Sequence, residues 1–152
     1  MDIAFVVDSS GSIGRTNWER MKRFLKALVS RLDVSPSAAH IAAIAYSNSP
    51  VVVMRFNGVQ DTNLINQLLD AMSYQRGFTY TDKALLLADS DIFQSSRGMR
   101  SNVPKVGFLS EWESNVKICC LPYLVVKTKK KTTVAVIIMG IIFFLCSDVM
   151  RA

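Results

Sequence analysis

The feature that most constrains this chain is a short polar loop that directly follows an apolar strand. Residues 3–7 read Ile-Ala-Phe-Val-Val, and such a continuous apolar run is typical of a strand covered on both faces, as in a parallel sheet. The next segment, 8–14, reads Asp-Ser-Ser-Gly-Ser-Ile-Gly, and a helical pattern begins after it. The loop is therefore predicted at the carboxyl end of a strand, where open α/β sheets bind their ligands.

The loop carries three oxygen donors at alternate positions. A tight turn can direct the carboxylate of Asp8 and the hydroxyls of Ser10 and Ser12 at one small cation, and Gly11 and Gly14 relieve the backbone strain of such a turn. Hard oxygen donors suit Mg²⁺, Mn²⁺ or Ca²⁺ and not Zn²⁺. The alternative interpretation is that these side chains only cap the helix that follows, because Asp and Ser are common at helix starts.

The loop resembles the first motif of the von Willebrand factor type A domain, Asp-x-Ser-x-Ser, which opens the metal-ion-dependent adhesion site of that family. The resemblance continues through Tyr46-Ser47, the segment 77–85 (Gly-Phe-Thr-Tyr-Thr-Asp-Lys-Ala-Leu) and the segment 103–106 (Val-Pro-Lys-Val). It covers about residues 1–106, with two separate motifs in the family's order. The chain is identified as a member of this family on that basis.

The resemblance implies a metal site formed by Asp8, Ser10, Ser12 and Thr79 that holds Mg²⁺, with Mn²⁺ or Ca²⁺ as alternatives. Asp8 is the only ionised group among these ligands, so the ion would keep a net positive charge and one position for water. An acidic side chain of a partner could replace that water. The expected function is a metal-dependent protein-binding (adhesion) module of an extracellular matrix or cell-surface protein, with collagen or another matrix protein as ligand.

Enzymatic and nucleic-acid functions are not expected. The chain has no phosphate-binding loop, no Gly-x-Ser-x-Gly elbow and no Gly-x-Gly-x-x-Gly motif. Its one histidine, His40, is expected to be a half-exposed structural residue, and a phosphatase of the aspartyl type would need a second Asp at Ser10. The net charge of +6 does not form a basic stripe with interleaved aromatic residues, so no nucleic-acid partner is predicted.

Apolar periodicity predicts alternating strands and helices. The expected fold class is α/β, a Rossmann-like, doubly wound and mostly parallel sheet with flanking helices. The resemblance adds the strand order 3-2-1-4, with the third strand at the edge. Either Asp61 or Thr62 is expected to cap the second helix, and Thr81 is expected to cap the third. The predicted strands are 3–7, 39–46, 51–56 and 105–109, and the predicted helices are 17–32, 63–73 and about 81–95.

The family pattern ends inside the fourth strand. A family member would continue to Thr-Asp-Gly, whose Asp helps to hold the metal, whereas this chain reads Gly-Phe-Leu-Ser-Glu-Trp-Glu-Ser over 107–114. Glu111 and Glu113 do not occupy the matching motif, so neither inherits that role. We therefore expect a truncated domain at 1–109 and an atypical tail at 110–152.

The tail contains a basic cluster at 127–131 and an uncharged apolar segment at 132–147. As a helix this segment would be about 24 Å long, slightly short of the ~30 Å of a bilayer core. Three interpretations stay open: a membrane span, a buried element that replaces missing parts of the fold, or translated non-coding sequence. Without strands beyond the fourth, that strand would be an exposed edge. The alternative function is thus a truncated, non-adhesive product with an incomplete metal site, anchored to a membrane through 132–147.

The compartment is inferred from the start of the chain and from its cysteines. No signal peptide precedes the first strand, so a fragment is expected, and the product would be extracellular or on the cell surface if a signal peptide lies upstream. A single-pass membrane protein is the alternative. Cys119, Cys120 and Cys146 all lie in the tail and define no disulfide framework.

Overall fold

The structure is a computed structural model that describes residues 1–110, 123–128 and 131–135. Its strands form one sheet in the order β3-β2-β1-β4-β5-β6, so the predicted order 3-2-1-4 is confirmed. The strands are β1 (Asp2–Asp8), β2 (His40–Tyr46), β3 (Val51–Met54), β4 (Lys105–Ser110), β5 (Tyr123–Thr128) and β6 (Lys131–Ala135).

The centre of the sheet is parallel and its edges are antiparallel. β1 pairs in parallel with β2 and β4, with Asp8 of β1 opposite Tyr46 of β2. β3 pairs antiparallel with β2 and occupies the edge, as predicted. β5 pairs antiparallel with β4, and β6 with β5, so β4 is not an edge strand. The parallel centre brings the carboxyl ends of β1 and β2 to the same side of the molecule, where the predicted metal loop lies.

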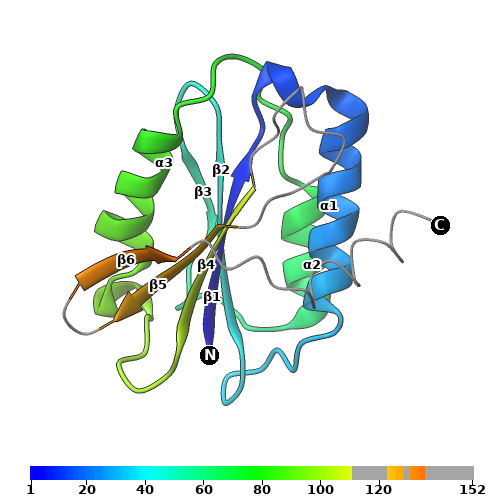
Figure 1. Cartoon of the computed structure of the whole chain (residues 1–152). Helices are drawn as coiled ribbons and strands as arrows, with labels where there is room; N and C mark the ends of the chain where they lie inside the picture. Colours follow the sequence, from blue (N-terminus) through cyan, green and yellow to red (C-terminus); the bar gives the residue numbers. More distant parts are fainter. Residues whose placement is uncertain (111–122, 129–130, 136–152) are drawn as a thin grey trace.

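Helices cover both faces of the sheet, which confirms the doubly wound architecture (Figure 1). Ile3, Phe5 and Val7 of β1 belong to a core shared with α1 (Arg15–Val29) and α2 (Thr62–Asp70). Ala4 and Val6 belong to a second core shared with α3 (Thr81–Leu87) and the π-helical turn η2 (Ala88–Ile92). Successive strand residues point to opposite faces, so one unbroken apolar run supplies both cores. The helices are α1 (Arg15–Val29), α2 (Thr62–Asp70) and α3 (Thr81–Leu87), with short turns η1 (Gly11–Ile13), η2 (Ala88–Ile92) and η3 (Ser95–Arg97).

All three helices end earlier than predicted, and α2 ends at Asp70, not at residue 73. α1 ends at Val29, not at residue 32, because the last predicted turn is closed by the tighter bonds Arg31 N to Leu28 O (3.0 Å) and Leu32 N to Val29 O (3.1 Å). The third helix is α-helical only to Leu87. It continues as η2, where Phe93 N donates to Ala88 O at 2.8 Å. The additional residue in this wider turn accompanies burial of both Ile92 and Phe93.

The second helix begins as predicted, since the side chain of Asp61 accepts a hydrogen bond from Leu64 N at 2.9 Å. Most of the tail, including Glu111, Glu113, the cysteines and residues 136–147, lies outside the described residues. Residues 132–135 belong to β6. Among the described residues, no helix is both long enough and apolar enough to cross a membrane. The division of the chain near residue 109 stays a prediction.

Candidate metal centre

The structure brings Asp8, Ser10 and Ser12 together in one turn at the carboxyl end of β1. Asp8 is the last residue of the strand and only 1% exposed. Its Oδ1 accepts a hydrogen bond from Ser10 N at 2.8 Å, and Ser10 Oγ lies 2.9 Å from Ser12 Oγ. A carboxylate and two hydroxyl oxygens of the predicted set are therefore held close together by local backbone geometry.

The capping interpretation of these residues is wrong. The N-cap of α1 is Gly14, and no side chain makes a capping hydrogen bond there. Ser10 is the N-cap of the short turn η1 and likewise makes no side-chain capping bond. The N-cap position of α1 is therefore occupied by a glycine and by none of these three residues.

The geometry and the chemistry of these donors fit a small hard cation. The Ser10 and Ser12 hydroxyls are hydrogen-bonded to each other at 2.9 Å, so the two oxygens already lie as close together as adjacent ligands of a small cation. No group of three or more His, Cys, Asp or Glu side chains that could hold a metal occurs within 1–110 and the described parts of β5 and β6. All donors of the predicted site are oxygens.

The segment 72–80, between α2 and α3, packs against this turn. Gly11 N donates to Gly77 O at 3.0 Å, and Arg76 N donates to Ser9 O at 3.0 Å. Thr79 lies exposed on the same segment, two residues after Gly77. The structure thus joins the loop that carries Thr79 to the loop that carries Asp8, while coordination by Thr79 stays a prediction.

A third segment, at the carboxyl end of β2, holds the second loop in place. Ser47 Oγ donates to the carbonyl oxygens of Arg76 (3.1 Å) and Phe78 (3.0 Å), and Tyr80 N donates to Ser47 O at 3.2 Å. The side chain of Asn48 accepts from Phe78 N at 2.9 Å. Sequence reasoning missed this positioning role. The available signal was the pair Tyr46-Ser47, which is one of the segments that resemble the family and which lies at the carboxyl end of β2.

The predictions for Thr81, beside the site, and for His40, at the far end of β2, have definite outcomes. The predicted capping role of Thr81 is wrong, because the N-cap of α3 is Tyr80 without a side-chain bond, and Thr81 Oγ1 instead lies 3.3 Å from Tyr46 Oη. His40 is a partly buried structural residue whose Nε2 lies 2.9 Å from Pro36 O. It lies at the amino end of β2, and the predicted metal loop follows the carboxyl end of β1.

The end of β4 also reaches this turn. Asp8 N donates to Ser110 Oγ at 3.4 Å, and Ser110 is almost fully buried. The next residues, where the family has Thr-Asp-Gly, lie outside the described part of the chain. The described site therefore contains a single carboxylate, that of Asp8, among its predicted ligands.

The structure is thus a doubly wound α/β domain with a turn of oxygen donors at the carboxyl end of its central strand β1. The sequence model of the von Willebrand factor type A domain matches residues 2–148, and this chain belongs to that family. It is 31% identical over 110 residues to rat von Willebrand factor, an alignment that covers 72% of this chain and 26% of the relative.

Two more comparisons place the chain among longer proteins. It is 35% identical over 104 residues to the human collagen alpha-6(VI) chain, covering 68% of this chain and 5% of that one. A solved structure of proximal thread matrix protein 1 from the mussel byssus, with a zinc-occupied MIDAS motif, superposes with a TM-score of 0.65 at 26% identity. That superposition covers 71% of this chain and 27% of the mussel protein. The chain thus spans about a quarter or less of each of these proteins.

Proposed function

We propose that this domain binds a protein partner through a divalent cation held by Asp8, Ser10, Ser12 and Thr79. The observation that carries the proposal is the 2.9 Å approach of the Ser10 and Ser12 hydroxyls beside the buried carboxylate of Asp8. The proposed ion is Mg²⁺, because carboxylate and hydroxyl oxygens are the hard donors that this ion prefers. Mn²⁺ and Ca²⁺ are the alternatives.

When bound, the cation supplies a positive charge that attracts an acidic side chain of the partner. The residues of this chain would fix the position of the cation and leave part of its charge uncompensated. Asp8 neutralises only half of it, the serines add no charge, and the bonds from Gly11 to Gly77 and from Ser47 to Phe78 fix the two loops. The role is recognition and not catalysis, since no nucleophile and base are proposed at the site.

The surface around Thr79 suits a protein ligand. Phe78 is 73% exposed and Tyr80 is 39% exposed, and their ring centroids lie 6.3 Å apart. Lys83 Nζ lies 3.9 Å from the centroid of the Tyr80 ring. Exposed aromatic residues are common at the centres of protein interfaces. The proposed partner is an extracellular matrix protein, with collagen as the first candidate, and the proposed location is extracellular or on the cell surface.

Titration of Mg²⁺ into the protein by calorimetry tests the site. Wild type should bind and Asp8→Ala should not, whereas Asp33→Ala, which removes an exposed carboxylate in the turn between α1 and β2, should behave as wild type. Equal binding by wild type and Asp8→Ala would end the proposal. Thr79→Ala tests the second loop separately, and unchanged affinity would exclude Thr79 as a ligand.

The same titration addresses the second candidate function, a truncated, non-adhesive product. The observation that favours this alternative is the departure from Thr-Asp-Gly after Ser110. A wild-type domain that is folded but binds no Mg²⁺ even at millimolar concentration would support it over adhesion.

A further inference from the structure

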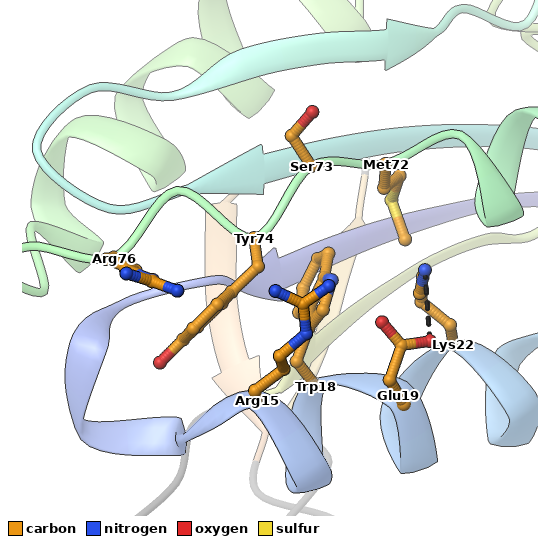
Figure 2. A pocket seen from close by; sticks show the side chains of 8 residues that line it. All are labelled: Arg15, Trp18, Glu19, Lys22, Met72, Ser73, Tyr74 and Arg76. Carbon is orange, nitrogen blue, oxygen red and sulfur yellow. Dashed lines mark ion pairs between the residues drawn. The ribbon is translucent and has the colours of Figure 1, made fainter.

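A cavity of about 340 Å³ lies between α1 and the segment 72–76 (Figure 2). It is next to the metal loop, residues 8–14. Arg15, Glu19 and Lys22 line it from α1, and Arg76 lines it from the facing segment. The hydroxyl of Tyr74, another lining residue, donates to Gly11 O at 3.1 Å. The cavity and the metal loop therefore share a wall.

The charges in this cavity do not cancel. Lys22 Nζ lies 3.2 Å from Glu19 Oε2, so these two groups compensate each other. Arg15 and Arg76 have no carboxylate partner within the described residues, where the ion pairs are those of Lys22, Lys26, Arg55, Arg97 and Arg100. Two guanidinium groups thus face the cavity with uncompensated charge.

Aromatic packing supports one of the two guanidinium groups, that of Arg76. The Tyr74 ring stacks on Trp18 with centroids 6.1 Å apart and planes inclined by 27°, and Trp18 is only 1% exposed. The Arg76 guanidinium carbon lies 5.7 Å from the centroid of the Tyr74 ring. Figure 2 shows the Arg15 and Arg76 side chains extending toward Tyr74 from the two walls of the cavity.

The backbone of Arg76 is also unusual. Its φ of 55° lies in the left-handed region, which non-glycine residues seldom adopt, and its amide is bonded to Ser9 O. The chain holds an arginine in a conformation where glycine would be less strained, directly beside the metal loop. Such outliers often mark binding sites.

We propose that this cavity binds a carboxylate of an acidic peptide segment. Guanidinium groups match carboxylates in a planar, bidentate geometry, and the partly exposed Tyr74 ring suits the aliphatic stem of a glutamate. A sulfated polysaccharide fits less well, because only two charges are uncompensated and Glu19 lies on the wall.

We place this acidic peptide segment on the same partner protein that contributes an acidic side chain to the metal. Only this assignment to one partner rests on the proposed function. Two acidic contacts on one chain would raise the apparent affinity, since the second forms at a high local concentration.

The test measures binding of a fluorescently labelled hexaglutamate peptide by polarisation at low salt, in excess EDTA so that the metal site contributes nothing. Wild type should bind. The double variant Arg15→Gln/Arg76→Gln should bind at least about tenfold more weakly. The matched control Arg23→Gln removes an exposed charge elsewhere on α1 and should stay within about twofold of wild type.

Glu19→Gln keeps the result interpretable if the double variant folds poorly, because removal of the one carboxylate of the cavity wall should tighten binding severalfold. No binding by wild type, or equal binding by wild type and the double variant, would overturn the proposal. So would tighter binding of a heparin-derived oligosaccharide that Arg23→Gln weakens as much as the double variant does. A second measurement, with Mg²⁺ in excess over EDTA, distinguishes the cavity proposal from the proposed function. Peptide binding that Mg²⁺ leaves unchanged contradicts metal-mediated binding of an acidic side chain and leaves the cavity proposal standing.

Discussion

Replacement of Gly77 by alanine should destabilise the domain and weaken its metal site, because this residue joins the two loops. Its φ of 123° is a conformation that side chains rarely adopt, and its carbonyl accepts the bond from Gly11 N. A Cβ at this position would lie 2.8 Å from Asn48 Nδ2 and 2.9 Å from Ser47 Oγ. Real Cβ atoms do not approach so closely, so either the backbone or these side chains must move.

The size of the effect follows from two contributions. A non-glycine residue in this backbone conformation costs about 1–3 kcal/mol. Movement of Asn48 or Ser47 also disrupts at least one hydrogen bond, Phe78 N to Asn48 Oδ1 or Ser47 Oγ to Phe78 O, which adds about 1 kcal/mol. The free energy of unfolding should therefore fall by roughly 2–4 kcal/mol.

Urea unfolding of the full chain measures this change, and Gly11→Ala is the matched control. A Cβ at Gly11 would meet only the backbone of Gly77 at 3.5 Å, an ordinary contact, so its effect should stay within about 1 kcal/mol. Gly14→Ala, at φ 73° and ψ 151° with open space around it, should cost about 1–3 kcal/mol from the backbone alone.

Mg²⁺ affinity should fall for Gly77→Ala, because the Thr79 segment shifts. If Gly77→Ala unfolds within 0.5 kcal/mol of wild type, or costs no more than Gly14→Ala, the inferred crowding of the two loops is wrong.

Two ion-pair predictions concern stability. Hydrogen bonding from Arg55 holds the pKa of Asp91 below its usual 3.8, so the ionised carboxylate stabilises the fold at neutral pH and that contribution is lost as the pH falls through the lowered value. Asp91→Asn should cost about 1 kcal/mol at pH 7, and the difference from wild type in urea unfolding should shrink in acid; a constant difference would contradict the cause. Arg100→Gln should lower the free energy of unfolding by about 3 kcal/mol, because it leaves the fully buried Asp2 carboxylate without its ion-pair partner, Arg100 Nη2 at 2.7 Å. The double variant with Asp2→Asn should recover part of that loss, and no recovery would exclude a stranded charge.

Local chemistry made much of the fold predictable. The apolar run 3–7 predicted a strand buried on both faces, and β1 supplies both cores. Apolar periodicity predicted a helix over 17–32, and Trp18 and Leu25 in this range lie on α1 and are buried. Each of these signals resides in neighbouring residues, because burial on one or two faces imposes a period on the sequence.

Features that depend on distant neighbours were not predictable in the same way. The π-helical turn at Ala88–Ile92 accompanies the pairing of Asp91 with Arg55 and Arg97, which lie in other segments. The failure of Thr81 as a cap likewise reflects its contact with Tyr46, 35 residues away. Local propensity contains no information about such partners, so it misplaces helix ends and caps.

The same distinction between local and long-range determinants applies to the candidate site. Sequence alone determined that Asp8, Ser10 and Ser12 lie in one turn after the central strand, because a few adjacent residues set that geometry. Only the tertiary structure decided that Gly77 meets Gly11, that Ser47 supports the second loop, and that Arg15 and Arg76 line a cavity together with Tyr74. The physical reason is that these contacts form between loops brought together by the parallel pairing of β1 and β2, and no local pattern in either loop specifies its neighbour.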